Sequence, residues 1–378
     1  MQTYLVGGAV RDTLLKRRIK DRDYVVVGAS PEQLVALGYK PVGKDFPVFL
    51  HPETQEEYAL ARVERKVGLG YGGFSFVTDA TVTLEEDLSR RDLTINAMAM
   101  DDQGNIIDPF NGQADLAHRI FKHVSPAFVE DPLRVLRIAR FMARYHQYGF
   151  TIAPETVELM KKIGHSGELA ALSAPRVWQE TALALGEFAP EIYFSVLIDT
   201  LCLSPWFDQL SASIRNIESL ALAFQHAKGL LESGEVTQDE HLAITTTLLT
   251  LGNKPQDVSA WTQLLPLPTF VQDCILLTHR HMNTMEQLDT LEAQQLLECL
   301  NQCDIHRRPQ RLALMIKVLS CYEQVSDFTL NYLFLENVVQ AAKSVNVQDI
   351  IAQGYQGADI KTQLQHAQLA QISTLLNR

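Results

Sequence analysis

The sequence is poor in cysteine and has no long hydrophobic run. Its apolar stretches all end before the ~18 residues that a membrane-spanning helix needs, and its first residues predict a strand instead of a signal peptide. The five cysteines, an odd number, all lie in the second half of the chain, and Cys299 and Cys303 are not accompanied by a second pair of His or Cys residues at zinc-ligand spacing. We therefore expect reduced, structural thiols and a cytoplasmic location.

Positively charged residues are also few. The chain has 33 Lys and Arg residues and 45 Asp and Glu residues, which gives a net charge of −12. The deficit is uneven: residues 1–150 are nearly neutral, whereas residues 151–378 carry almost all of the negative charge. The N-terminal part can therefore attract a polyanion locally, and the acidic remainder weakens non-specific binding. The composition allows a nucleic-acid partner without requiring one.

Strand patterns nearly vanish after Pro126, where apolar residues begin to recur at helical spacing. The fold class predicted from this change is an α+β head followed by an elongated helical array. The strands expected in the head are 4–6, 24–27, 48–51, 57–61 and 95–100. The helices expected there are 9–15, 31–36, 84–89 and 112–117. A glycine-rich segment within 67–76 predicts a mobile loop.

The first motif is a short apolar run that ends in Gly7-Gly8 and leads into a helix pattern. Glycine lets the backbone turn tightly at this point, and the first N–H groups of a helix have no partner within the helix. Those N–H groups, together with the helix dipole, favour a bound phosphate. The pattern therefore predicts a phosphate-binding turn at Gly8.

Two carboxylates, Asp21 and Asp23, stand just before the strand pattern of 24–27. Residues two apart at the end of a strand project to the same side, where two carboxylates repel each other unless a cation lies between them. Mg²⁺ is the usual cation for such oxygen ligands. A third carboxylate is expected on a neighbouring strand, and Glu57 is the candidate, with Glu56 as its rival.

Two further basic segments are candidates for contacts with a nucleotide. Arg90 and Arg91, followed by Asn96, suit triphosphate oxygens and a ribose hydroxyl, although this run could also be a basic helix end with a charge pair. The second segment opens a long helix with Asp131 and places an arginine at every third position. These arginines are Arg134, Arg137 and Arg140. The alternative is a solvated basic stripe, but no acid interrupts it between 132 and 150.

Asp131 and Arg134 together could distinguish bases. Cytosine and adenine present an amine donor beside a ring-nitrogen acceptor on their pairing edges, whereas uracil and guanine present the reverse. A carboxylate that accepts from the amine and a guanidinium that donates to the ring nitrogen would select C and A. Each charged hydrogen bond contributes about 1.5–3 kcal/mol, so losing both would discriminate strongly.

These motifs resemble those of class II tRNA nucleotidyltransferases, the CCA-adding enzymes of bacteria, in the family that also holds bacterial poly(A) polymerases. The matching segments, in the family's order and spacing, are 5–12, 21–23, 62–74, 90–97, 108–112 and 130–140. Segments 44–49 and 123–128 resemble the gammaproteobacterial type in particular. Segment 175–180 resembles a later motif in the family's helical neck, and 307–311 and 354–357 resemble its tail.

The resemblance implies a polymerase-β-like nucleotidyltransferase head with a mixed sheet at 1–125. It also implies an all-α neck with the base template at 126–205, a body at 206–300 and a tRNA-binding tail at 301–378. In this reading a tRNA 3′ hydroxyl attacks the α-phosphate of CTP or ATP, held on Mg²⁺ by Asp21 and Asp23, with Glu57 as a further catalytic residue. The nucleotide-binding residues that the resemblance implies are Gly8, Arg11, Arg91, Asp131, Arg134, Arg137 and Arg140.

One feature departs from the family pattern. Relatives of this type often carry a metal-dependent phosphohydrolase domain built on His and adjacent His-Asp ligands, and this chain has no His-Asp dipeptide. We therefore expect no phosphohydrolase metal site and place His241, His279 and His281 on helix surfaces. The alternatives to a CCA-adding enzyme are a CC-adding or A-adding specialist, a bacterial poly(A) polymerase and a non-catalytic tRNA-binding protein.

Overall fold

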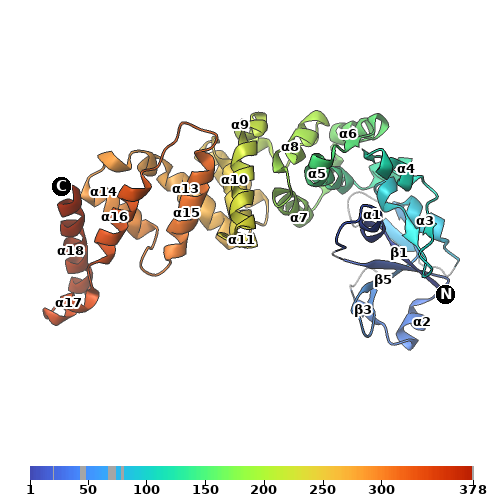
Figure 1. The fold of residues 1–378 in the computed structure, drawn as a ribbon, viewed down its shortest axis with the longest axis horizontal. Coiled ribbons are helices and arrows are strands. Elements are labelled where there is room, and N and C mark those ends of the chain that lie inside the picture. The colour runs from blue at the N-terminus through green and yellow to red at the C-terminus, as the bar shows by residue number, and fades with distance from the viewer. Residues whose placement is uncertain (20, 43–47, 67–73, 78–80, 377–378) are drawn as a thin grey trace. The chain divides into compact units, whose positions relative to one another are not determined.

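The computed structural model describes residues 1–19, 21–42, 48–66, 74–77 and 81–376 (Figure 1). Its internal contacts divide the chain into two compact units. The first unit comprises residues 1–188 and 192–208, and the second comprises 189–191 and 209–378. No helix in the described part of the chain is both long and apolar enough to cross a membrane.

The first unit begins with a seven-stranded sheet in the order β3-β4-β5-β2-β1-β8-β9. Its strands are β1 (Gln2–Val6), β2 (Asp23–Val27), β3 (Lys40–Val42), β4 (Val48–Leu50), β5 (Glu57–Leu60), β8 (Ala99–Met100) and β9 (Ile106–Ile107). β2 and β5 run parallel, and the other neighbouring strands are antiparallel. The mixed sheet predicted for the head is therefore confirmed. The helices of this region are α1 (Gly8–Leu14), α2 (Pro31–Ala36), α3 (Leu84–Ser89) and α4 (Gly112–Ala117).

The sheet has a core on each face because neighbouring residues of a strand point to opposite sides. In β2, Val25 belongs to a buried cluster with Val6, whereas Val26 packs with Leu34 of α2. Asp23 shares the parity of Val25. The first residue of β2 thus places its carboxylate on the Val25 face, where the strand begins.

Two expected elements of the head differ in the structure. Residues 95–100, expected as one strand, form a 3₁₀ turn at Thr94–Asn96 before β8. The backbone of α4 lies so close to this turn that a Cβ on Gly112 would be 2.2 Å from the Thr94 carbonyl oxygen. The glycine-rich segment expected as a loop is flanked by an antiparallel pair, β6 (Val63–Lys66) and β7 (Phe74–Val77). Residues 67–73 lie outside the described residues, as do 44–47 of the family resemblance.

The rest of the first unit is helical apart from one short parallel pair, β10 (Ile120–Phe121) and β11 (Thr151–Ile152). Its helices are α5 (Leu133–Tyr145), α6 (Pro154–Ser166), α7 (Ala174–Leu185) and α8 (Pro190–Asp199). The rings of Phe121, Tyr145 and Phe150 pack together and fix the C-terminal end of α5. The helix α5 is strongly amphipathic.

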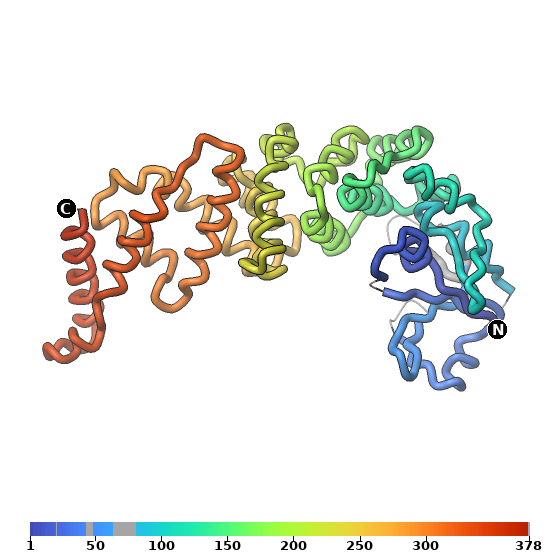
Figure 2. The backbone as a smooth tube through the Cα atoms, in the orientation of Figure 1, coloured from blue at the N-terminus to red at the C-terminus, as the bar shows by residue number. Residues whose placement is uncertain are grey.

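The second unit is built of helices that follow one another along the chain (Figure 2). They are α9 (Ser211–Arg215), α10 (Ala221–Glu232), α11 (Gln238–Thr250), α12 (Pro255–Leu264), α13 (Thr269–Glu286), α14 (Ala293–Gln302), α15 (Pro309–Tyr322), α16 (Tyr332–Lys343), α17 (Val347–Ala352) and α18 (Ala358–Leu376). The predicted α+β head followed by helices is confirmed. The division into head, neck, body and tail stays a prediction.

The expectation that the histidines lie on helix surfaces is wrong for two of the three. His241 and His281 are only 2% and 4% exposed, whereas His279 is partly buried. Residues Ala243–Thr250 of α11 are buried in succession, so this helix is covered on all sides. A sequence pattern that assumes one solvent-facing side misplaces a histidine on such a helix.

Candidate functional site

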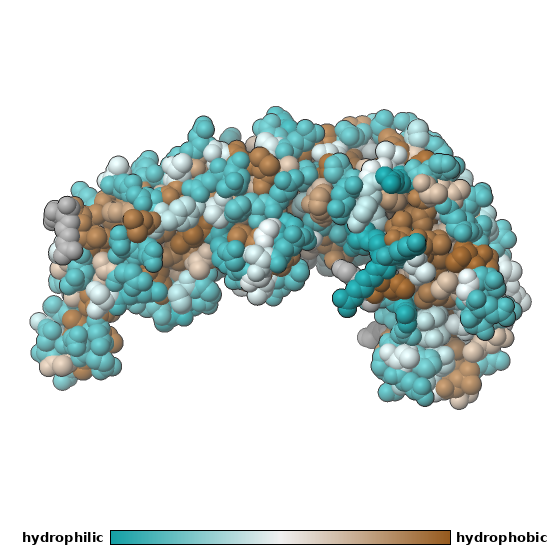
Figure 3. All heavy atoms as spheres, viewed as in Figure 1, coloured by the Kyte–Doolittle hydropathy of each residue, from teal (hydrophilic) through white to brown (hydrophobic). Residues whose placement is uncertain are grey.

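The first unit contains a cleft of about 760 Å³ between the head sheet and α5. Guanidinium groups dominate its lining, and they belong to Arg11, Arg17, Arg18, Arg62, Arg90, Arg91, Arg134, Arg137, Arg140, Arg144 and Arg176. In the space-filling view, strongly hydrophilic side chains of the head stand beside hydrophobic ones (Figure 3). A cavity with so many cations attracts a polyanion, and planar guanidinium groups suit phosphate oxygens.

Nine of the ten predicted site residues line this cleft. They are Gly8, Arg11, Asp21, Asp23, Arg91, Asp131, Arg134, Arg137 and Arg140. The tenth, Glu57, lines a neighbouring cavity of about 700 Å³ that shares Asp21 and Asp23 with the first. The structure therefore brings the predicted residues into one region, although their roles in binding and catalysis stay predictions.

The turn between β1 and α1 depends on Gly7 more than on the predicted Gly8. Gly7 has φ +70° and ψ −130°, a backbone conformation that favours glycine. A Cβ at this position would lie 2.8 Å from Nη1 of Arg91. Gly7 thus allows the Arg91 guanidinium to lie directly against the backbone at the start of α1.

Arg11 is almost wholly buried and held from several sides. Its Nη1 donates to Oδ1 of Asn96 at 2.6 Å, and its Nε donates to Oδ1 of Asp12 at 2.9 Å. The guanidinium also lies 5.4 Å from the ring centres of Phe141 and Tyr145. Its Nη2 is the atom nearest to Gly8, 3.4 Å from the point where a Cβ would be. Arg11 thereby presents one fixed nitrogen at the glycine turn.

The carboxylates of the strand edge come from two parallel strands. Asp23 of β2 is in register with Glu57 of β5, and in-register residues of parallel strands project to the same face. Glu56 has the opposite parity and pairs with Arg22 at 3.6 Å. Register and pairing therefore both favour Glu57 over Glu56 as the third carboxylate.

The donor set at this edge fits a hard divalent cation. The pKa of Asp23 is raised above its ordinary value. Desolvation is the largest cause, the nearby Arg91 acts in the opposite direction, and the neighbouring Asp21 carboxylate adds to the rise. Carboxylate oxygens that repel each other in this way are the ligands that Mg²⁺ prefers. The same cleft holds a buried Arg91 Nε without a hydrogen-bond partner among the residues that the structure describes. Such a donor fits an anionic group beside the carboxylates.

The arginines of α5 are not a solvated stripe. Arg134 and Arg140 are 9% and 6% exposed, and each has protein partners. Arg140 donates from Nε to Oε2 of Glu180 at 2.6 Å, and Arg137 donates from Nε to Oδ2 of Asp92 at 2.8 Å. Nη1 of Arg137 also lies 3.6 Å from Oε1 of Glu180. Two buried carboxylates thus fix two of the three arginines.

The Asp92–Arg137 pair is ionised. Burial alone would raise the pKa of Asp92, but Arg137 and a hydrogen bond from Asn96 hold it far below its ordinary value. The Asp92 carboxylate in turn raises the pKa of Arg137. Asn96 donates to Oδ1 of Asp92 at 3.0 Å while it accepts from Arg11. A single network therefore connects Arg11 of the head with Arg137 of α5.

The two residues of the predicted base template line the same cleft, and the side chain of each is held by other groups of the protein. Oδ2 of Asp131 accepts from Nη2 of Arg176 at 3.3 Å, and Oδ1 accepts from the backbone N–H of Leu133, where α5 begins. Arg134 donates to the backbone carbonyls of Ala127 and Arg90. The protein therefore fixes both groups before a base is bound.

Sequence reasoning missed Glu180 and Asp92 as the partners of the α5 arginines. One signal was present for Glu180, which stands between Val177 and Ala184 on the apolar face of α7. A carboxylate at a buried helical position needs a cation. No comparable signal was present for Asp92, because its partner Arg137 lies 45 positions away along the chain.

Over its head, this chain is similar to proteins of the poly(A) polymerase class. Residues 3–122 match the family described as "Poly A polymerase head domain", and residues 149–214 match "Probable RNA and SrmB- binding site of polymerase A". The head match spans the sheet and the carboxylate pair.

The particular family follows from full-length relatives. The chain is 45% identical to a "Multifunctional CCA protein" of Pseudoalteromonas atlantica over 99% of both chains. It is also 45% identical to a "CCA-adding enzyme" of Pseudomonas putida over 98% of this chain and 97% of the relative. A solved structure of the Bacillus stearothermophilus CCA-adding enzyme in complex with CTP is 25% identical, with a TM-score of 0.63, over 99% of this chain and 89% of that one. This chain belongs to the CCA-adding enzyme family.

Proposed function

We propose that this protein adds and repairs the 3′-terminal CCA sequence of tRNA, using CTP and ATP and releasing pyrophosphate. The observation that carries the proposal is the cleft, in which Asp21 and Asp23 face arginines from both α1 and α5. Full-length identity to CCA-adding enzymes supports the substrate assignment, as does the CTP complex of a structural relative. CTP, ATP and tRNA are found in the cytosol, and five free thiols suit a reducing compartment. Both points favour a cytoplasmic location.

The reaction forms a bond between the tRNA 3′ oxygen and the α-phosphorus and breaks the bond from that phosphorus to the β-phosphate. Asp21 and Asp23, with Glu57 beside them, would hold Mg²⁺, which when bound neutralises phosphate charge and lowers the pKa of the attacking hydroxyl. Arg91 and Arg11, at the glycine turn, would orient the triphosphate. Pyrophosphate leaves toward these guanidinium groups, which stabilise its growing charge.

Asp131 and Arg134 would read the base, and Arg137 and Arg140 would hold the nucleotide beside them. Their protein partners keep these side chains fixed, so little ordering cost is incurred on binding. A pocket fixed in this way accepts cytosine and adenine through the same pair of hydrogen bonds. Uracil and guanine leave a buried donor or acceptor unpaired, which costs about 1–3 kcal/mol for each group.

The test uses purified protein, a tRNA transcript lacking its last three nucleotides, Mg²⁺ and single or mixed nucleotides. Growth by two C and one A, with UTP and GTP refused, is expected. Growth by C alone, or by A only on a transcript ending in CC, would mean a specialist enzyme. Long A tails on any RNA would mean a poly(A) polymerase, and tRNA binding without incorporation would overturn the proposal.

The metal requirement is tested separately. Removal of divalent cations with EDTA should abolish incorporation, and Mg²⁺ should restore it. Asp21→Ala and Asp23→Ala should each lose activity by more than about 1,000-fold, since both ligands serve one ion. Asp102→Ala, at an exposed turn outside the cleft, is the matched control and should keep full activity. Activity in EDTA would contradict the metal assignment.

A further inference from the structure

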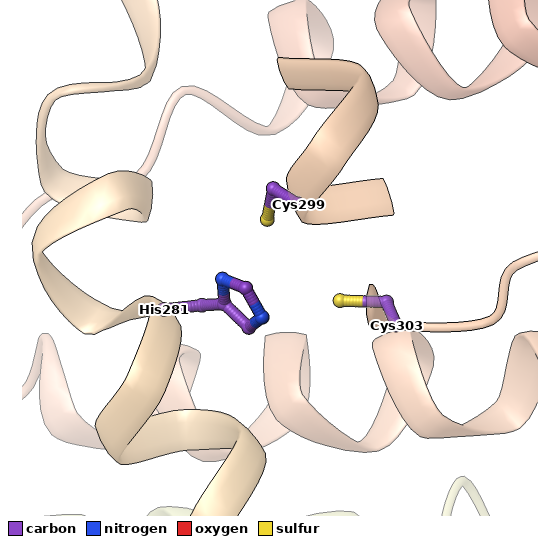
Figure 4. A group of neighbouring side chains, drawn as sticks. All are labelled: His281, Cys299 and Cys303. Carbon is purple, nitrogen blue, oxygen red and sulfur yellow. The ribbon is translucent and has the colours of Figure 1, made fainter. Parts of the chain in front are cut away.

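A second group of metal-ligating side chains lies in the second unit, buried among helices that contain no part of the cleft. His281 comes from α13, Cys299 from α14, and Cys303 from the residue that ends α14. Their exposed fractions are 4%, 4% and 0%. Both sulfur atoms point toward the imidazole ring (Figure 4). One ligand atom from each residue lies within 4.8 Å of the other two.

Within the described part of the chain, the Nε2 atom of His281 lacks the hydrogen-bond partner that a buried polar atom normally has. Among the residues that the structure describes, no hydrogen-bonding group is in reach of its Nε2 atom. Nε2 of His279, on the same helix, meets the Thr250 hydroxyl at 2.9 Å, and Nε2 of His306 meets the Gln368 side chain at 3.0 Å. A buried nitrogen left alone beside two sulfurs indicates a missing ligand.

The two thiols are suited to become metal ligands. Cys299 and Cys303 are four residues apart, so the α-helix places them on the same face. The positively charged Arg311 side chain lies close enough to Cys303 to interact with it electrostatically. Arg311 is held in place by two 2.6 Å contacts to Asp273. A thiolate at Cys303 therefore has a cation beside it.

We propose that His281, Cys299 and Cys303 bind one Zn²⁺ ion. Two thiolates and a neutral imidazole balance the charge of a divalent cation, which keeps the buried site neutral. Sulfur and imidazole ligands favour Zn²⁺ over Mg²⁺, which requires oxygen ligands. A tetrahedral zinc ion spaces such ligand atoms about 3.5–3.8 Å apart, so shifts of about 1 Å suffice. The fourth position is left for water or a small ligand.

Zinc at this place would connect consecutive helices of the second unit. Cys299 and Cys303 belong to one apolar cluster that also contains Leu277 of α13 and Leu300 of α14. Eighteen positions separate His281 from Cys299, so no short zinc motif appears in the sequence. The ion would fix α13 against α14 and stabilise this cluster, a role independent of the nucleotide cleft.

The first experiment measures metal directly in the full-length protein. The chain is purified under reducing conditions, stripped with EDTA, incubated with Zn²⁺ or Mg²⁺, desalted and analysed by mass spectrometry of the elements. One zinc per chain and no retained Mg²⁺ are expected. Co²⁺ added to the stripped protein should give the near-ultraviolet sulfur-to-metal absorption of thiolate coordination. A wild-type chain that retains no zinc and gives no such absorption would overturn the proposal.

Variants then assign the ligands. Cys303→Ala, Cys299→Ala and His281→Gln should each lose the retained zinc and the zinc-dependent rise in melting temperature. Cys321→Ala is the matched control, because Cys321 is equally buried in the same unit and belongs to no such cluster among the described residues. Equal zinc retention by all four variants would place the metal elsewhere and contradict the assignment. Circular dichroism separates loss of metal from loss of fold.

Discussion

Arg140 on α5 donates a 2.6 Å hydrogen bond to Glu180 on α7, and both side chains are more than nine-tenths buried. Two opposite charges lose their hydration when they are buried, and their attraction offsets this desolvation cost only in part. Such a pair therefore contributes little to stability by itself. Its effect here is geometric. Glu180 lies between Arg137 and Arg140 and fixes the direction of both guanidinium groups at the cleft.

Replacing Glu180 by Gln should therefore weaken nucleotide binding. The amide has nearly the same shape but no charge, and a hydrogen bond to a charged group contributes about 1.5–3 kcal/mol. We expect the KM for both CTP and ATP to rise about tenfold and the melting temperature to fall. Steady-state kinetics and thermal unfolding measure these effects. Glu158→Gln, which alters an exposed pair with Lys161, is the control and should change neither quantity.

Gly7 is expected to tolerate no side chain. Gly7→Ala places a methyl group 2.8 Å from Nη1 of Arg91 and forces alanine to φ +70°. The proposed contact of Arg91 with the triphosphate implies that its displacement reduces kcat/KM by about tenfold or more. Gly104→Ala is the matched control, because Gly104 has φ +85° but nothing within 4 Å of its Cβ position. Equal activity of the two variants would show that Arg91 does not need this space.

Much of the cleft could be predicted because its motifs are local. The Gly7-Gly8 turn, the Asp21 and Asp23 pair and the arginine repeat each lie within one short segment, where periodicity and turn chemistry indicate geometry. The partners that hold these groups could not be predicted. Asp92 and Glu180 reach Arg137 and Arg140 only through packing between distant segments. The His281 cluster was missed for the same reason, since helix packing creates it.

His241 should make the protein less stable in weak acid. Burial lowers its pKa to about 4, from 6.5, so the folded chain keeps it neutral while the unfolded chain takes up a proton. Above pH 6.5 the histidine is neutral in both states and does not lower the free energy of unfolding. Between pH 6.5 and pH 4 that free energy falls by up to about 1.4 kcal/mol per pH unit, because only the unfolded chain binds the proton. Urea unfolding at pH 7, 6 and 5 measures this slope. His241→Gln should flatten it, and a slope unchanged in that variant would contradict the assignment.

The final prediction concerns base selection by Asp131. Its Oδ2 atom contacts Nη2 of Arg176, so Arg176 holds the carboxylate in the direction from which an amine of cytosine or adenine would donate. Asp131→Asn turns part of this acceptor into a donor, which suits the carbonyl of uracil or guanine.

The preference for CTP and ATP over UTP and GTP should therefore fall by about 10- to 100-fold in Asp131→Asn, as measured by single-nucleotide incorporation. Arg176→Ala should lower the same preference less, because the backbone N–H of Leu133 still holds Oδ1. Glu130→Gln changes the adjacent residue outside the cleft and should leave selection intact. If Asp131→Asn keeps full selectivity while its overall rate falls, Asp131 positions the nucleotide and the base is read by other groups.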